Sequence, residues 1–275
     1  MTSTAAQQIR ASYAFVERNA YLVKRYWSWE LVWLAYSIAN SLSVSYIGLG
    51  MQQISGQAVD GTFLVLYLVV GTLVWRYLSL IFYWITDVIA LERWEGTIEY
   101  TLMAPIHRLT HMAGQTIFAV AYSLIFTAII LGVTVVLFNI DLSSANLSAA
   151  TVVLLSGSLS FVGVGIMGSI LPLLFPERGS QMTHVIIAIL LLVSGVYYPI
   201  DVLPKFLQNL SVASPATYVL RGVRAALLDG AGVSALWPEI FAALLIGVAT
   251  IPVGLWVFGL AERYAKRTGK LHRSG

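Results

Sequence analysis

Six apolar runs leave this sequence few ways to fold. They cover about residues 29–50, 63–90, 113–138, 148–173, 183–199 and 236–260. A helix of about 20 apolar residues crosses the roughly 30 Å of hydrocarbon in a bilayer. Because lipid offers no partners to backbone polar groups, such runs cross a membrane as helices. The sequence therefore predicts an all-α integral membrane protein with six transmembrane helices between residues 29 and 260.

The composition leaves little room for a separate soluble domain. Of the 275 residues, 58% are hydrophobic and 11% are charged, whereas soluble domains carry roughly 25% charged residues. The chain contains no cysteine, which excludes disulfides, thiolate metal sites and cysteine nucleophiles. The net charge of +3 does not indicate binding to nucleic acid, because membrane topology explains the basic residues.

Residues 1–28 precede the first apolar run, and residues 8–27 have the pattern of an amphipathic helix. Its apolar side chains recur at spacings of three and four: Ile9, Tyr13, Val16, Ala20, Val23 and Trp27. Basic residues occupy its other sides, as in helices that lie at a membrane surface. We expect an interfacial helix here, and a soluble coiled-coil seam is the alternative.

Lys and Arg residues predict the orientation, because cytoplasmic loops are enriched in them. With the N-terminus inside, the inner segments carry Arg10, Arg18, Lys24, Arg25, Arg93, Arg108, Arg178, Arg263, Lys266, Arg267, Lys270 and Arg273. The outer links carry only Lys205, Arg221 and Arg224. This bias predicts that both termini are cytoplasmic, including the basic tail at residues 261–275.

A polar block at residues 92–111 lies between the second and third runs, on the predicted cytoplasmic side. It is expected to be helical through Met103 and to break at Pro105. Glu92, Glu95 and Glu99 recur at helical spacing. The block is either a solvated link or a short helix that a soluble partner grips.

The outer link at residues 197–230 is too apolar for a free loop. Pro199, Pro204 and Pro215 divide it into short pieces. We expect two short helices that dip back into the outer leaflet, where protein or a wet cavity must cover the turns. A plain extracellular cap is the alternative.

Polar residues within the runs are candidates for a transport pathway, because burying them in lipid is costly. Arg76 lies near the middle of the second run, and Asp87 lies three helical turns further on. Asn40 shares one side of the first span with Ser37 and Ser41. Either these residues find partners on other helices, or Arg76 and Asn40 face a pathway.

The common catalytic motifs are missing. Gly163, Gly165 and Gly168 match G-x-G-x-x-G, but they lie inside an apolar run, so close helix packing explains them better than a nucleotide site. No G-x-x-x-x-G-K-[ST] motif occurs, so any ATP used must bind another chain. His107 and His111 lack the H-E-x-x-H pattern and are expected to be solvated. The sequence predicts no catalytic site and no metal site.

Three stretches carry a family resemblance. Residues 92–105 read ERWEGTIEYTLMAP, and residues 197–224 contain YYP, LP, SPxTY and LRGxR in order. Together with the N-terminal amphipathic helix, they resemble the ABC-2 type permeases, the membrane subunits of bacterial ABC exporters. The family's cytoplasmic stretch is E-x-x-x-G-T-[LI]-E-x-L-x-x-[ST]-P, and Ala104 stands where Ser or Thr is common. The resemblance covers nearly the whole chain.

The resemblance implies an ATP-driven exporter in a bacterial plasma membrane. The chain would pair with a second permease subunit, forming a homodimer, and with two copies of a cytosolic ABC ATPase. ATP and Mg would bind the ATPase, so this chain would hold no cofactor and would not itself be an enzyme. The cargo would be an amphiphile, a drug or a lipid-linked glycan that leaves the cytoplasm or the inner leaflet.

The resemblance also assigns roles to two segments. The block at about residues 92–105 would be a coupling helix seated on the ATPase, a role carried by Glu92, Glu95, Gly96, Thr97, Glu99 and Pro105. The outer segment would close the mouth of the dimer through Tyr197, Tyr198, Pro199, Pro204 and Pro215. The alternative function is a secondary transporter or channel that needs no ATPase, which internal repeats and broken helices near the midplane would favour.

Overall fold

The computed structural model describes residues 5–55, 61–104 and 106–269. In these ranges the chain is mostly helical, and they contain no strand. The helices are α1 (Ala5–Arg25), α2 (Trp27–Ser55), α3 (Gly61–Glu95), α4 (Ile98–Met103), α5 (Arg108–Phe138), α6 (Leu147–Gly168), α7 (Ile170–Leu174), α8 (Gly179–Val193), η1 (Ile200–Val202), α9 (Lys205–Ala213), α10 (Pro215–Leu228) and α11 (Trp237–Arg267).

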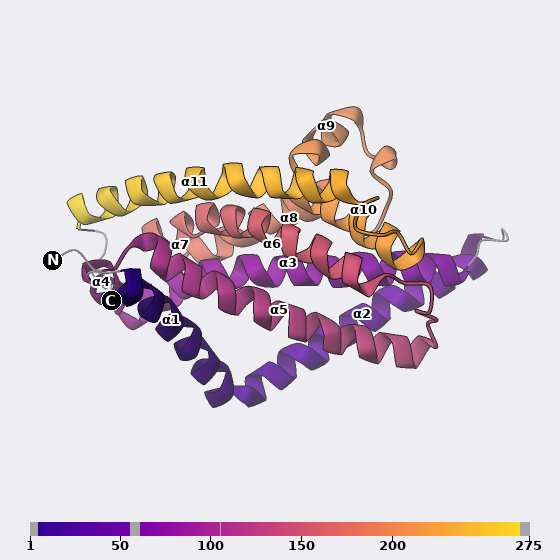
Figure 1. The fold of residues 1–275 in the computed structure, drawn as a ribbon, viewed down its shortest axis with the longest axis horizontal. Coiled ribbons are helices and arrows are strands. Elements are labelled where there is room, and N and C mark those ends of the chain that lie inside the picture. Colours follow the sequence, from indigo (N-terminus) through magenta and orange to yellow (C-terminus); the bar gives the residue numbers. More distant parts are fainter. Residues whose placement is uncertain (1–4, 56–60, 105, 270–275) are drawn as a thin grey trace.

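The long helices form one elongated bundle (Figure 1). In the described part of the chain, 5 stretches are long and apolar enough to cross a membrane: α2, α3, α5, α6 with α7, and α11. The prediction of an all-α membrane protein is confirmed. The sixth predicted span, at residues 183–199, differs, because α8 has 15 residues and rises only about 22 Å. Gly195 adopts a left-handed φ of 69° just after α8, so the helix cannot continue.

Helix α3 lies at the centre of the bundle and is mostly buried, whereas α2, α5 and α11 are mostly exposed. It packs against α2, α5, α6, α8 and α10. Tyr77, Leu78, Ile81 and Phe82 are completely buried in the main core. Polar residues on α3 therefore face other helices, and the cavities between them, more than open surface.

Glycines let α6 approach its neighbours closely. A methyl group added to Gly163 would lie 2.1 Å from Thr250 Oγ1 on α11, and one added to Gly157 would lie 2.3 Å from Val219 Cγ2 on α10. The interpretation of the α6 glycines as packing residues is confirmed.

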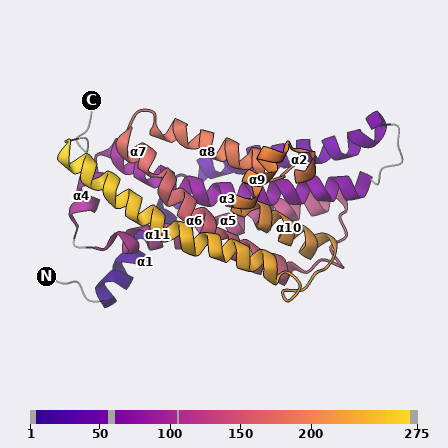
Figure 2. The ribbon, with the colours of Figure 1, turned by 90° about the horizontal axis from the view of Figure 1, so that it is seen from above.

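The two ends of the bundle carry different segments. Helix α4, the turn between α7 and α8 and the end of α11 gather at one end, and the α5–α6 and α10–α11 links lie at the other (Figures 1 and 2). Helix α1 packs against α5 and meets α2 at a sharp angle near Tyr26 (Figure 1). Both described ends of the chain thus lie at the end that holds α4.

The segment before α11 forms two short helices, as predicted. Pro204 precedes α9, and Pro215 is the first residue of α10, where a missing N–H costs no helical hydrogen bond. Helix α10 packs against α6, α3 and α11, whereas Phe206 and Leu210 of α9 are exposed. The insertion of this segment into a leaflet remains a prediction.

Candidate functional site

Helix α3 ends in a tight corner that leads into α4. Gly96 has a φ of 75°, and the Thr97 N–H donates to the Glu92 carbonyl at 2.9 Å. A glycine in the left-handed region with this backward hydrogen bond is a common helix C-terminus. The prediction of one helix through Met103 is therefore wrong, because Gly96 ends α3 first. Pro105, the predicted end of the block, lies outside the described residues.

Glu92 is buried beneath this corner rather than presented on it. It is 1% exposed, and its Oε1 accepts from Arg18 Nη1 at 3.1 Å. The same oxygen lies 3.3 Å from His111 Nε2. One carboxylate thus ties α3 to α1 and α5, and the expectation that His111 is solvated is wrong.

A polar network continues from this ion pair along α1 and α5. His111 Nε2 lies 3.5 Å from the Gln115 amide, and Asn19 donates to the Gln115 oxygen at 2.5 Å. The Phe15 ring packs on the imidazole with centroids 4.7 Å apart. We call Glu92, Arg18 and His111 the Glu92 site. Helical spacing placed Glu92 beside Glu95 and could not reveal partners on two other helices.

An exposed surface lies on the outer side of the corner. Trp94, Tyr100 and Met103 are 77%, 78% and 81% exposed, and Glu95 is also exposed. Ile98 is buried and holds α4 against the bundle. We call Trp94, Glu95, Tyr100 and Met103 the corner patch. Exposed large apolar side chains of this kind mark protein–protein or membrane interaction sites.

Gly96, Thr97 and Glu99 contribute to the corner differently from the patch. All three are partly buried. The Thr97 hydroxyl lies 3.4 Å from the Glu92 carbonyl, which adds a second link across the turn. These residues shape the corner, while the patch forms its outer surface.

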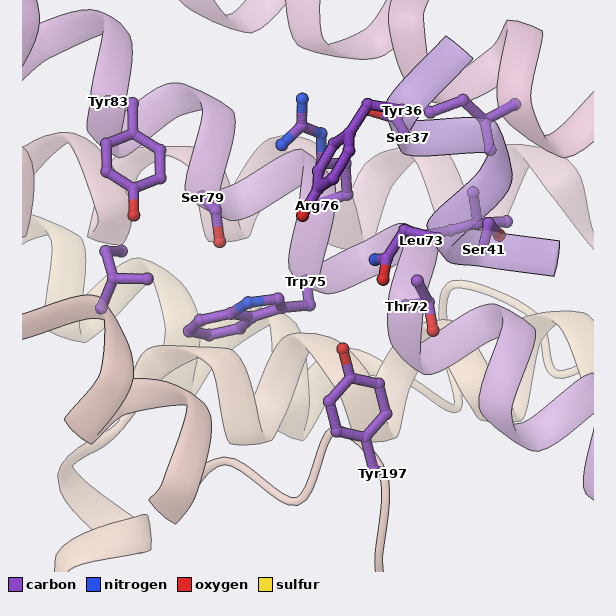
Figure 3. A pocket seen from close by; sticks show the side chains of 13 residues that line it. Tyr36, Ser37, Ser41, Thr72, Leu73, Trp75, Arg76, Ser79, Tyr83 and Tyr197 are labelled. Atoms are coloured by element: carbon purple, nitrogen blue, oxygen red, sulfur yellow. The ribbon is translucent and has the colours of Figure 1, made fainter. Parts of the chain in front are cut away.

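A cavity of about 210 Å³ lies midway along the bundle, between α2, α3, α5 and α8. Its lining brings together Arg76 and Asn40, the two predicted pathway residues, with Trp75, Ser79 and Tyr197. In Figure 3 the hydroxyl groups of Ser79, Tyr83 and Tyr197 point toward the space beside the Trp75 ring. We call this space the Arg76 cavity.

Two further cavities follow the Arg76 cavity toward the α4 end. One, of about 640 Å³, shares Tyr36, Arg76 and Tyr83 with it. The next, of about 430 Å³, shares Trp84 and Asp87 with the second and reaches Trp94. The three cavities therefore follow one another along α3, from mid-bundle to the corner patch.

Aromatic rings line the second cavity. Trp84 packs edge-on to Tyr122, with centroids 5.2 Å apart, and Tyr122 stacks on Phe126 at 5.4 Å. The Tyr122 hydroxyl donates to the Glu30 carboxylate. Sequence reasoning missed Tyr122 and Glu30, because neither stands out within its own helix.

The predicted outer residues fall into different surroundings. Tyr197 lines the Arg76 cavity, and the Tyr198 hydroxyl donates to the Leu192 carbonyl at 2.6 Å. Pro199 precedes the short helix η1, while Pro204 and Pro215 begin the next two helices. Of the five residues, only Tyr197 reaches the cavity; the other four shape the chain after α8.

Arg224 of α10 holds the turn that positions Tyr197. Its guanidinium donates to the carbonyls of Gly195 at 3.0 Å and Val196 at 2.6 Å, and it lies 3.5 Å from the centre of the Tyr67 ring. Burial lowers the pKa of Arg224 to about 10, so it stays charged at neutral pH. A methyl group on Gly71 would lie 2.2 Å from the Val196 carbonyl oxygen, so only glycine admits this approach.

The described residues contain no group of three or more His, Cys, Asp or Glu side chains that could hold a metal ion. Residues 12–228 match the family model described as ABC-2 type transporter. The match covers well over half of the chain and includes the α3–α4 corner, all three cavities and α10. A comparison with curated proteins finds no match.

Proposed function

Because the chain belongs to the ABC-2 type transporter family, we propose that it is the permease subunit of an ATP-driven exporter. Its cargo, an amphiphile, a drug or a lipid-linked glycan, leaves the cytoplasm or the inner leaflet. The chain supplies the pathway, and a separate cytosolic ABC ATPase binds ATP and Mg and hydrolyses the nucleotide. The assembly contains two permease chains, in our proposal a homodimer, and two ATPase chains in a bacterial plasma membrane.

The corner patch is the observation that carries this proposal. It presents two aromatic rings, a thioether and a carboxylate at the end of the bundle where both described chain ends lie. Aromatic and methionine side chains are enriched where proteins bind one another. We place the ATPase on this patch, with both termini of the permease in the cytoplasm.

The Glu92 site gives this contact mechanical leverage. Only a stiff connection transmits a push at the patch to the membrane helices, and Glu92 joins α3 to α1 and α5 directly under the patch. Glu95, Gly96, Thr97 and Glu99 keep their proposed coupling role at the corner. Glu92 acts in this scheme as an internal link and makes no contact with the ATPase.

Movement of α3 reaches the cavities, because Arg76, Asp87 and Trp94 all belong to that helix. The outer segment closes the far side of the pathway through Tyr197, which Arg224 holds in place. Asn40 and Tyr36 are exposed in the single chain, which supports a second permease copy covering the α2 side of the Arg76 cavity.

The test compares variants of the patch with a matched change elsewhere. Full-length permease is co-expressed with its candidate ABC ATPase, and co-purification and ATP hydrolysis are measured. Trp94→Ala combined with Tyr100→Ala should lower ATPase recovery at least tenfold, as expected when interface hot spots are truncated. Phe206→Ala, which removes an exposed ring from α9, should leave recovery unchanged.

Two results would overturn the proposal. One is full ATPase assembly and export by the Trp94 and Tyr100 double variant. The other is undiminished transport in vesicles that contain the permease and no ATP-hydrolysing protein, as a secondary transporter would give.

A further inference from the structure

Three buried polar atoms that belong to lining residues of the Arg76 cavity have no hydrogen-bond partner in the described part of the chain. They are Arg76 Nε, Ser41 Oγ and Ser79 Oγ. Ser41 and Ser79 are only 1% and 4% exposed. Buried polar atoms in native proteins nearly always have partners. Single unpaired atoms also occur elsewhere in the described residues, as at Glu92 Oε2 and Arg224 Nε, but here three belong to the lining of one cavity.

Other hydroxyl groups in the same lining are already satisfied. Ser37 donates to the Trp33 carbonyl at 2.7 Å, and Thr72 donates to the Leu68 carbonyl at 2.8 Å. This local bond is the usual one for Ser and Thr within a helix. Ser41 and Ser79 form no such bond, so their hydroxyl groups have no partner among the described residues.

The charge of Arg76 also lacks a counter-ion within the described residues. Glu30 and Asp87 line the neighbouring cavity, but neither approaches the guanidinium within the 4.0 Å of an ion pair. The nearest aromatic support is the Phe126 ring, with its centroid 5.8 Å away. A cation at this depth of a membrane helix is costly unless a partner neutralises it.

The Arg76 cavity and the adjoining cavity differ in size and lining, so they suit different parts of one ligand. The Arg76 cavity, at about 210 Å³, is smaller than the roughly 300–1,000 Å³ of sites that enclose a drug-sized molecule. It suits an acidic head group. The adjoining cavity of about 640 Å³ is lined by Trp29, Trp33 and Leu80 beside polar residues that include Glu30 and Asp87, and its aromatic rings can contact an apolar portion.

We propose that the Arg76 cavity binds the oxyanion head group of the cargo, and that the cargo is therefore an anionic amphiphile. This rests on the proposed export function. The Arg76 guanidinium holds the charge, and the hydroxyl groups of Ser41 and Ser79 donate to the remaining oxygens. Phosphate, sulfate and carboxylate heads share this chemistry, because planar guanidinium groups pair well with oxyanions.

The experiment measures equilibrium binding of radiolabelled dodecyl phosphate to full-length permease in nanodiscs of phosphatidylcholine. Dodecanol is the uncharged comparison, and inorganic phosphate tests for a site that takes free anions. The variants are Arg76→Gln, Arg76→Lys and Ser79→Ala. Arg221→Gln is the matched control, because it removes an exposed arginine from α10.

The wild type should bind dodecyl phosphate about tenfold or more tightly than dodecanol, as one charge-assisted hydrogen bond suffices to produce. Arg76→Gln should abolish this preference, Ser79→Ala should reduce it, and Arg76→Lys should retain part of it. Arg221→Gln should leave it unchanged, and excess inorganic phosphate should not displace the labelled amphiphile.

The inference would be overturned if Arg76→Gln kept the preference for dodecyl phosphate over dodecanol, or if Arg221→Gln lost it equally. Displacement of the labelled amphiphile by inorganic phosphate alone would also overturn it. So would the loss of dimer assembly in both Arg76 variants. The last would show that a second copy neutralises Arg76. None of these measurements involves the ATPase. A permease that exports with ATP but binds no anionic amphiphile would contradict this inference and leave the proposed function standing. A permease that binds the anionic amphiphile but does not assemble with an ATPase would contradict the proposed function alone.

Discussion

Glu92 and Arg76 are both charged residues of α3, but their surroundings differ: Glu92 has charged partners and Arg76 has none among the described residues. Glu92 is enclosed by Arg18 and His111. Arg76 faces a cavity, and no carboxylate among the described residues forms an ion pair with it. A buried charge with its partners in place joins helices together. A buried charge without a counter-ion lowers the stability of the fold. In our proposal the cargo's head group supplies the counter-ion of Arg76.

Arg224 extends the comparison to a second buried arginine. Its two Nη atoms donate to carbonyls and it lies over an aromatic ring, whereas the described contact of Arg76 is to the Phe126 ring, 5.8 Å away. The Nε atom lacks a partner among the described residues in both arginines. The same residue type therefore serves structure at the outer turn and remains unsatisfied in the cavity.

Glu92→Ala should have the largest effect. It leaves His111 buried without its carboxylate and removes the ion pair with Arg18, whose side chain is 37% exposed. Hydrogen bonds to a charged group contribute about 1.5–3 kcal/mol each, so we expect a loss of about 3 kcal/mol. Thermal unfolding of the full chain in detergent should report this loss. Glu95→Ala removes an exposed carboxylate from the same corner and should change stability by less than about 0.5 kcal/mol. Equal effects of the two changes would remove the distinction between the buried link and the exposed patch.

Arg224→Met should come next, at about 2 kcal/mol, because hydrogen bonds to a charged group contribute roughly that much. The turn at Gly195 should also become more sensitive to protease, since its carbonyls lose their donor. Arg221→Met on the same helix is the control and should be nearly neutral. A stable Arg224→Met protein with a protected turn would mean that packing of α10 alone holds the outer segment.

The helices themselves were predictable from the sequence, because apolar length decides which segments can cross a membrane. Hydropathy could not show that α8 ends at Val193, since Leu191, Leu192 and Val193 continue the apolar run. The turn depends on Gly195 and on the Arg224 guanidinium 29 residues further along the chain. A contact of that range leaves no mark in local composition.

The candidate site was predictable in part. Arg76 and Asn40 stood out because polar residues are expensive in a membrane, and the structure brings them to one cavity. Glu92 stood out for the wrong reason, since its spacing from Glu95 suggested a shared exposed face. Burial of Glu92 follows from Arg18 and His111 on other helices, which one helix's periodicity cannot reveal.

Gly96→Ala should have a smaller effect, of about 1 kcal/mol, because it places a side chain in the left-handed region. Nothing lies within 4 Å of the added methyl group, so backbone strain is the whole cause. Gly132→Ala in α5 also meets nothing within 4 Å and should not destabilise the chain. Thermal unfolding of both, together with ATPase recovery, would show whether Gly96 or the Glu92 site sets the angle of the corner.

Arg76→Met should have the smallest effect on stability and the clearest effect on export. Methionine fills much of the volume of arginine and removes a charge that no described residue neutralises, so unfolding should shift by less than about 0.5 kcal/mol or toward greater stability. Export by the complete complex should fall, because the cargo's head group loses its counter-charge. Unfolding in detergent and export in vesicles measure the two separately. A loss of stability comparable with that of Glu92→Ala would mean that Arg76 is paired in the assembled protein, and the contrast between the two sites would then disappear.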